Sequence, residues 1–322
     1  FNVDSTLYEY YQRCQEYLLE PVVLNMSDTL FRMAGERQDE RMQAVAIATQ
    51  LDYYYFQGTN EDSVIHYTNK VKEFAKATHQ PKYYYFAWAN RLITYYLKTS
   101  RTNIALYEVQ NMLKEAQEED DKTGLSRCYN IMSQIYTIKR FDSMAFEWRL
   151  KEIELTEKYK IENYNISQTY AQIANYYINQ KKQKEALAAV EKAIATANSS
   201  TQQISAKLEF VNYYSKFGDF QAAEKLLKEC QAAFEQDKRL ESIKKRLYNI
   251  ECLYYQQTKQ YPKALEAAKM QEKEERRLSE SILSSIHYRT QGEIYQKMGN
   301  MNLAVKYLQM YINTDDSLKI AN

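Results

Sequence analysis

The chain has 322 residues, and its 43 lysines and arginines are nearly balanced by 42 aspartates and glutamates, which leaves a net charge of +1. Charges of both signs are interspersed, which argues against the basic face that nucleic-acid binding requires. Only six glycines and three prolines occur, which excludes long flexible linkers, and no stretch is apolar over enough residues to span a membrane.

The strongest pattern in the sequence is a tyrosine that recurs at intervals of 37 to 41 residues. Nine positions after each tyrosine stands a small aliphatic residue. The tyrosines are Tyr55, Tyr96, Tyr136, Tyr177, Tyr214, Tyr255 and Tyr295, and the small residues are Val64, Ala105, Ala145, Ala186, Ala223, Ala264 and Ala304. A sequence period of roughly 20–50 residues is typical of repeat proteins.

Within one repeat, this spacing resembles the tetratricopeptide repeat (TPR), a helix pair with an aromatic residue at slot 11 and a small residue at slot 20. The best match runs from Tyr288 to Gly299, followed by Ala304, and a degenerate first repeat has Cys14 and Val23 in these slots. Eight repeats are predicted, starting near residues 4, 45, 86, 126, 167, 204, 245 and 285. The resemblance implies an all-α fold over residues 1–322, a single α-α superhelix (TPR-like solenoid) of helix-turn-helix repeats of roughly 40 residues.

Prolines mark expected helix boundaries along the chain. Pro21 and Pro262 fall at slot 18, in the first turn of a second helix, where a missing N–H does no harm. Pro81 falls between repeats, where helices stop. Because the repeat exceeds the usual length, we expect long helices, for example over Ile104–Glu119 and Tyr261–Ser281.

Glycines mark the turn inside two of the repeats. Gly218 and Gly299 both fall at slot 15, and each is followed by a residue that can cap the next helix, Asp219 or Asn300. Strand-like alternation of apolar and polar residues is absent, so no sheet is expected.

No pattern of catalytic or metal-binding residues is present. Four cysteines fall in four different repeats without CxxC spacing, and we expect buried thiols, with a Cys230–Cys252 disulfide between neighbouring repeats as the alternative. The histidines, His66, His79 and His287, are far apart, and no phosphate-binding or nucleophile motif occurs. The sequence therefore predicts no enzymatic activity in this segment, no metal site and no cofactor.

The chain's 31 tyrosines allow two interpretations. One is an aromatic platform for sugars or peptides, and the other is core packing with the hydroxyl at the edge. The strict phase of slots 10 and 11 favours packing. Tyr53, about 100° further around its helix, is expected to face the groove of the superhelix.

In a TPR superhelix the first helix of each repeat lines the concave face, with slots 2, 5, 9, 12 and 13 pointing into it. Neutral amides fill many of these slots here, and Arg127, Arg246 and Arg289 stand among them. Amides offer both donors and acceptors to the backbone of an extended peptide. Simple solvation of a polar face is the alternative. Our candidate ligand contacts are Tyr53, Asn90, Asn130, Gln134, Asn175, Asn179, Asn212, Asn249, Gln256 and Arg289.

The lysine-plus-asparagine pattern with which chaperone-tail TPR domains hold a terminal carboxylate is not present in these slots, so that ligand is not carried over. The partners expected for the groove are a peptide, a protein or an oligosaccharide. Neither nucleic acid nor direct contact of this segment with a membrane is expected.

Longer sequence segments resemble a narrower family, the N-terminal TPR sensor region of bacterial two-component sensor histidine kinases. They are Tyr83–Leu97, Arg149–Tyr159, Phe210–Phe234 and Tyr307–Asn322. The resemblance implies an exported, periplasmic sensor domain, preceded by a leader peptide and followed by a linker, one membrane span and a kinase core. Dimerisation would then occur through the parent receptor. The segments carry no catalytic residue, and His287 lies in a repeat helix rather than in a phospho-acceptor motif.

Three hypotheses follow. The first is a ligand-binding sensor domain of a membrane-bound histidine kinase, whose last helix, near Lys306–Asn322, transmits binding to the membrane. The second is a freestanding TPR adaptor for protein complexes, with a cytoplasmic location as the alternative. The third is a peptide-responsive transcription regulator, although no helix-turn-helix module for DNA occurs in these residues. The gene sequence beyond Asn322 separates the three.

Overall fold

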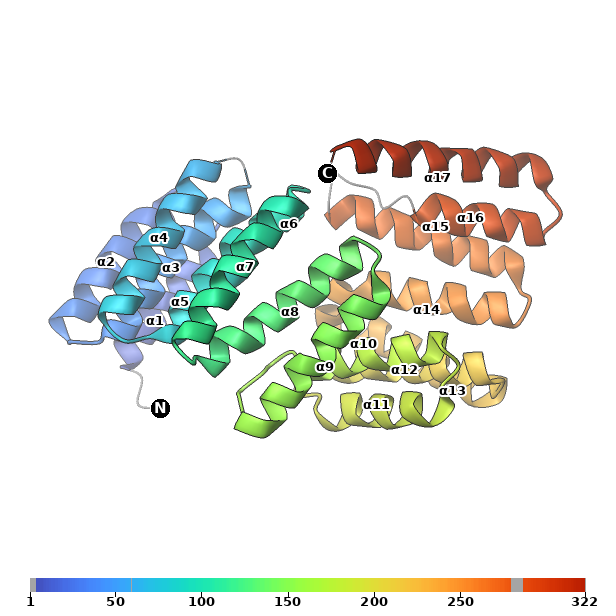
Figure 1. Cartoon of the computed structure of the whole chain (residues 1–322), viewed down its shortest axis with the longest axis horizontal. Helices are drawn as coiled ribbons and strands as arrows, with labels where there is room; N and C mark the ends of the chain where they lie inside the picture. Colours follow the sequence, from blue (N-terminus) through green and yellow to red (C-terminus); the bar gives the residue numbers. More distant parts are fainter. Residues whose placement is uncertain (1–3, 59, 279–285, 322) are drawn as a thin grey trace. The chain divides into compact units, whose positions relative to one another are not determined.

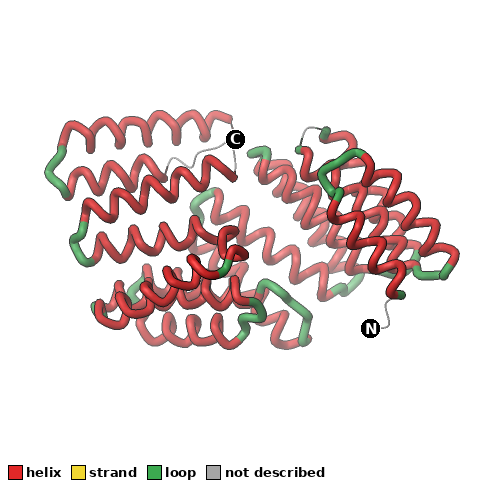
Figure 2. The backbone as a smooth tube through the Cα atoms, turned by 180° about the vertical axis from the view of Figure 1, so that it is seen from behind, coloured by secondary structure: helices red, strands yellow, loops and turns green. Residues whose placement is uncertain are grey.

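The computed structural model describes residues 4–58, 60–278 and 286–321, and all regular structure in these ranges is helical (Figures 1 and 2). Successive helices form pairs joined by short turns. The pairs are α1 (Ser5–Glu16) with α2 (Val22–Glu36); α3 (Glu40–Gln57) with α4 (Glu61–Ala77); α5 (Pro81–Ala87), η1 (Trp88–Ile93) and α6 (Thr94–Lys98) with α7 (Thr102–Glu118); α8 (Lys122–Ile138) with α9 (Asp142–Tyr159); α10 (Ile166–Asn179) with α11 (Gln183–Ala195); α12 (Ser200–Phe217) with α13 (Phe220–Gln236); η2 (Lys238–Ile243) and α14 (Lys244–Gln257) with α15 (Tyr261–Leu278); and α16 (Ile286–Lys297) with α17 (Met301–Ala321). These pairs follow the predicted repeats in order, so the all-helical, repeat-based prediction is confirmed.

Helix boundaries follow local capping chemistry. Gly218 ends α12 in the left-handed region, with φ of 89°, and the Asp219 side chain then accepts a hydrogen bond of 3.0 Å from the Ala222 N–H. Gly299 has φ of 76°, and Asn300 caps α17 in the same way. The two turns predicted from glycine followed by a capping residue are therefore confirmed.

The prolines stand at helix starts. Pro21 is the N-cap residue of α2, Pro81 is the first residue of α5, and Pro262 is the second residue of α15. The prediction of long helices is confirmed by α7, with 17 residues, and α15, with 18. Residues 279–281 and 322, which end two of the predicted segments, lie outside the described ranges.

The chain falls into two compact units, unit 1 (Phe1–Ile161) and unit 2 (Glu162–Asn322). In unit 1, α3 packs against α1 and α5, and α5 packs against α8. In unit 2, α12 packs against both α10 and α14. The first helices of successive repeats thus form one layer in each unit. The exposed side of this layer is the first-helix face of that unit. One continuous superhelix through both units stays a prediction.

The two repeating columns are packing positions. All seven small residues are at most 1% exposed. Tyr55, Tyr96 and Tyr295 are buried, and the other four tyrosines are half-buried. At slot 8 of the last repeat, a Cβ added to Gly292 would lie 2.9 Å from the Leu308 side chain. The small residues therefore permit the close helix approach that the repeat requires.

The first helix of the third repeat contains a π-helical turn, η1. The Thr94 hydroxyl donates a 2.9 Å hydrogen bond to the Ala89 carbonyl, five residues earlier. Asn90 and Arg91 both lie in this widened turn. Such turns are rare and frequently coincide with functional sites.

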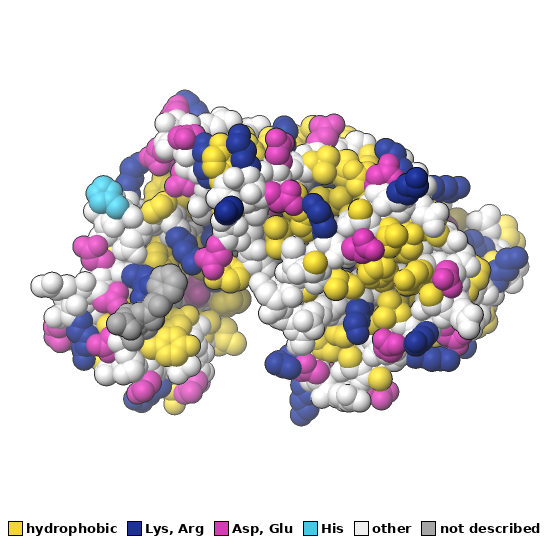
Figure 3. All heavy atoms as spheres, turned by 90° about the horizontal axis from the view of Figure 1, so that it is seen from below, with side chains coloured by type: hydrophobic (Ala, Val, Ile, Leu, Met, Phe, Trp, Pro, Cys, Tyr) yellow, Lys and Arg dark blue, Asp and Glu magenta, His cyan; other side chains and the backbone are white. Residues whose placement is uncertain are grey.

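No helix among the described residues combines the length and apolarity needed to cross a membrane. The same ranges contain no group of three histidine, cysteine or carboxylate side chains able to hold a metal ion. Figure 3 shows one face of the molecule, on which basic and acidic side chains are mixed.

All four cysteines are free and buried, so the thiol interpretation is confirmed and the Cys230–Cys252 disulfide is not formed. Burial raises the pKa of Cys14, Cys230 and Cys252 to about 11 and that of Cys128 to about 12. A raised pKa disfavours the thiolate, which is the reactive form of the side chain.

Stability is therefore expected to fall at alkaline pH. Below the ordinary thiol pKa of ~8.5 the thiols are neutral in the folded and in the unfolded protein, so their burial does not reduce the free energy of unfolding. As pH rises towards the folded-state values of about 11, unfolded thiols ionise while folded ones do not, so the free energy of unfolding decreases. Urea unfolding across this range measures the effect. Rapid labelling of the native protein by a thiol reagent at neutral pH would contradict the burial.

Candidate functional site

A groove of about 510 Å³ opens on the first-helix face of unit 2. Its walls come from α10, α12 and α14, with one side formed by α15. The polar residues that line it include Gln168, Ser205, Lys245, Arg246, Asn249 and Gln271. Gln168, Ser205 and Arg246 occupy slot 2 of three successive repeats. The groove thus follows positions that the repeat register assigns to the inner face.

The groove offers hydroxyl, amide and cationic groups. Lys245 and Arg246 are its cationic groups, of which Arg246 is paired with Glu209 behind the lining, and none of the residues that line it is acidic. Ala171 and Ala206 leave space between the polar side chains. A surface of this composition can hydrogen-bond both the donors and the acceptors of a ligand and favours a negatively charged group over a positive one.

A buried carboxylate behind the groove lining holds one of the residues that form it. Glu209 on α12 is 2% exposed and accepts hydrogen bonds from Asn212 at 2.8 Å and Asn175 at 3.3 Å. The Arg246 Nη2 forms an ion pair with it at 2.8 Å, while the Arg246 Nε is buried without a partner. Glu209 therefore ties α10, α12 and α14 together and fixes the arginine that lines the groove.

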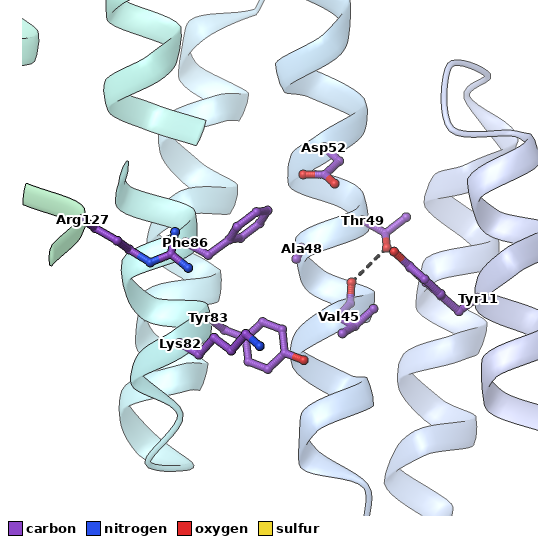
Figure 4. A pocket seen from close by; sticks show the side chains of 9 residues that line it. All are labelled: Tyr11, Val45, Ala48, Thr49, Asp52, Lys82, Tyr83, Phe86 and Arg127. Carbon is purple, nitrogen blue, oxygen red and sulfur yellow. Dashed lines mark hydrogen bonds between the residues drawn. The ribbon is translucent and has the colours of Figure 1, made fainter. Parts of the chain in front are cut away.

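Unit 1 has a smaller pocket on its own first-helix face, with a volume of about 140 Å³. Figure 4 shows Arg127 entering it from α8, on the side opposite Tyr11 of α1. Its apolar wall is formed by Val45, Ala48 and Phe86, and the other side chains that line it are Tyr11, Thr49, Asp52, Lys82, Tyr83 and Arg127.

Asp52 in this pocket has a counterion. The Arg91 Nε lies 2.5 Å from the Asp52 carboxylate, and both side chains are 16% exposed. Burial raises the pKa of Asp52, and the hydrogen bond and charge of Arg91 oppose that rise. The ion pair connects α3 to the π-helical turn.

In unit 1 the candidate residues from the sequence mostly contact other protein groups. Asn130 donates to both oxygens of the buried Glu152 at 3.2 Å, and Gln134 donates to Asn130 at 2.7 Å. Asn90 accepts a hydrogen bond from Arg127. Tyr53 is half-buried, packs beside the N-terminal core cluster and makes an edge contact with Tyr54, so it does not line the pocket.

In unit 2 the structure brings only Asn249 of the candidate residues into the groove lining. Asn175 and Asn212 are bound to Glu209, and Asn179 donates to Asn175 at 2.9 Å. Gln256 accepts a hydrogen bond from Lys297, and Arg289 pairs with Glu293 at 2.8 Å. These side chains therefore bond other protein groups, some within one helix and some between two, and their role in ligand binding stays a prediction.

Sequence reasoning missed the acidic partners, Glu209 and Glu152, and the Asp52–Arg91 pair. A signal did exist, since Glu209 stands between Leu208 and Phe210 in an otherwise apolar run. Buried carboxylates require partners. An acidic residue on the core side of a helix could therefore have been matched with the nearby amides.

No protein-family model matches this sequence, and no curated protein matches it. Several solved structures are similar in fold. The structure of a Rap protein complexed with competence and sporulation factor has 11% sequence identity and a TM-score of 0.55, with 99% of each chain covered. NprR in complex with its cognate peptide NprX has 13% identity and a TM-score of 0.57, covering 83% of this chain and 77% of that one. The apo quorum sensor NprR from B. thuringiensis has 14% identity and a TM-score of 0.53, covering 97% and 99%. At such identities the similarity concerns the fold alone, which is a TPR-like all-helical solenoid.

Proposed function

We propose that this chain is a peptide-binding domain and that the groove of unit 2 is its binding site. The observation that carries the proposal is the set of amide, hydroxyl and cationic side chains that repeat in register along one groove. The groove volume of about 510 Å³ falls within the range of roughly 300–1,000 Å³ that is usual for ligand sites. That NprR, similar in fold, was solved with a peptide supports the choice of ligand.

The groove favours a peptide in extended conformation. Gln168 and Asn249 lie at slots 2 and 5 of different repeats, where each amide can pair with a backbone N–H and a backbone carbonyl. Lys245 then favours a peptide that carries an acidic side chain near these amides, while Arg246, already paired with Glu209, adds hydrogen-bond donors.

The proposal is tested by affinity selection of a random peptide pool on the immobilised protein, with mass-spectrometric identification of the retained peptides. Acidic peptides are expected. Gln168→Ala combined with Asn249→Ala should weaken a selected peptide about 30-fold, because two hydrogen bonds of roughly 1 kcal/mol each are lost.

The matched control is Asn302→Ala, an exposed amide on α17 away from the groove, which should leave affinity unchanged. Retention of full affinity by the double variant, measured by calorimetry, would place the peptide elsewhere.

For the parent protein we propose the sensor role of a membrane-bound histidine kinase, with this domain in the periplasm. Support comes from the family-like segments, such as Phe210–Phe234 in α12 and α13, and Tyr307–Asn322, whose residues up to Ala321 lie in α17. A binding event in the groove would be transmitted through α17 to the following linker. A gene that encodes no membrane span and kinase core beyond Asn322 would leave a freestanding adaptor as the better reading.

A further inference from the structure

We infer that the pocket of unit 1 is a second binding site, which takes a carboxylate attached to an apolar body and holds the carboxylate with the Arg127 guanidinium. This site is separate from the groove proposed above and involves none of its residues.

Arg127 is a half-buried cation without a counterion. The Arg127 Nε is inaccessible to water and has no hydrogen-bond partner. The guanidinium donates one hydrogen bond, from Nη1 to the Asn90 side-chain oxygen. Burial lowers the pKa of Arg127, with no neighbouring carboxylate to oppose the shift. Removing a charge from water without a partner is costly, so a bound anion would relieve a real energetic deficit.

Other arginines of unit 1 differ from Arg127. Arg91 is paired with Asp52 at 2.5 Å, and Arg101 is paired with Glu61 at 2.6 Å. Both have an acidic partner from a neighbouring helix. Because the Arg127 Nε is inaccessible, a ligand meets the end of the guanidinium, where Nη2 is not used by Asn90 and can donate a charge-assisted hydrogen bond to a carboxylate.

The rest of the pocket selects the body of the ligand. Val45, Ala48 and Phe86 give an apolar lining, and Figure 4 shows the Tyr83 ring on the side of Phe86 and the Tyr11 ring on the opposite side. The volume of about 140 Å³ is close to the ~150 Å³ of a cavity that holds benzene. A phenyl or branched aliphatic group therefore fits beside the guanidinium.

Charge in the pocket favours an acid over an amine. The Asp52 carboxylate is already paired with Arg91, and Lys82 adds a second cation to the lining. The π-helical turn places Arg91 against Asp52 and Asn90 against Arg127, so the same local distortion prepares both contacts.

The test uses the full 322-residue chain and two matched pairs of probes. The first pair is 3-phenylpropionate and its amide, and the second is a tripeptide ending in phenylalanine with a free or an amidated C-terminus. Binding is measured by calorimetry or NMR titration. Wild-type protein should bind at least one acid about 10- to 100-fold more tightly than its amide, as expected for a charge-assisted hydrogen bond.

Arg127→Met should abolish this preference without lowering the melting temperature, because it removes a cation that the empty pocket leaves uncompensated. Arg127→Lys keeps the charge but loses the planar guanidinium that Asn90 holds in place, and should weaken the acid about 10-fold. Arg32→Met, which changes an exposed arginine of α2 outside the pocket, should retain the preference.

Equal affinity of wild-type protein for acid and amide, absence of acid binding, or an unchanged preference in Arg127→Met would overturn the inference. Preference for the peptide acid alone identifies a peptide C-terminus as the natural occupant, and comparable binding of 3-phenylpropionate identifies a small acid. The Gln168→Ala, Asn249→Ala variant should behave as wild type here, so failure of the peptide groove and failure of this site are distinguishable.

Discussion

Replacing Arg246 with methionine is expected to lower the free energy of unfolding by about 3 kcal/mol, the lower part of the range for breaking a buried ion pair. The substitution keeps the volume of the side chain but leaves the Glu209 carboxylate, 2% exposed, with only its two amide donors. The Arg246 side chain is itself 27% exposed, which is why the lower part of the range applies. Urea-induced unfolding followed by circular dichroism measures the change.

Two further variants separate loss of the ion pair from loss of packing. Adding Glu209→Gln to Arg246→Met removes the unpaired charge and should restore most of the lost stability. Lys244→Met removes the neighbouring cation, which pairs with the exposed Glu241, and should cost less than ~0.5 kcal/mol. A loss of similar size in Arg246→Met and in the double variant would show that the carboxylate does not need the arginine.

Replacing Gly124 with alanine is expected to destabilise unit 1 by about 2 kcal/mol, although alanine is normally the better helix former. A Cβ at this position of α8 would lie 2.4 Å from the Cζ of Tyr85 on α5. Tyr85 is 1% exposed and cannot move aside without displacing its neighbours. Thermal unfolding should show the loss as a lower transition temperature.

Gly35→Ala is the matched control, because Gly35 also lies inside a helix but faces the flexible end of Gln43. It should be neutral or raise stability by up to about 1 kcal/mol. Tyr85→Leu should recover part of the loss in the Gly124→Ala background, and the double-mutant cycle gives the coupling between the two positions. Similar effects of Gly35→Ala and Gly124→Ala would show that helix propensity, not contact with Tyr85, governs both.

The fold could be predicted because the repeat makes the same packing demand many times. One small residue such as Ala186 means little, but seven in phase, all at most 1% exposed, report a recurring close approach between helices. Turn chemistry added independent information, since Gly218 and Asp219 specify a helix end and a helix start from local backbone preferences alone. Both signals lie within about 40 residues of each other along the chain and need no knowledge of distant contacts.

The sequence could predict only which helix surface carries the candidate site. The repeat register placed Gln168, Arg246 and Asn249 on the first-helix surface, and the structure brings them into one groove. The register could not show that Asn175 and Asn212 are bound to Glu209, because a slot gives the direction of a side chain but not its partner on the next helix. Nor could it show the π-helical turn at Trp88–Ile93, which shifts the register locally.

The sequence by itself therefore determined an all-helical TPR-like solenoid, the positions of its eight helix pairs and the absence of recognisable catalytic motifs, because periodicity and capping act over short distances along the chain. Tertiary structure decided which polar side chains are paired and which are left over. The contrast between Arg246, paired with Glu209, and Arg127, half-buried without an acidic partner, arises from contacts between residues that are 37 positions apart. These are properties of packed helices that no single repeat encodes.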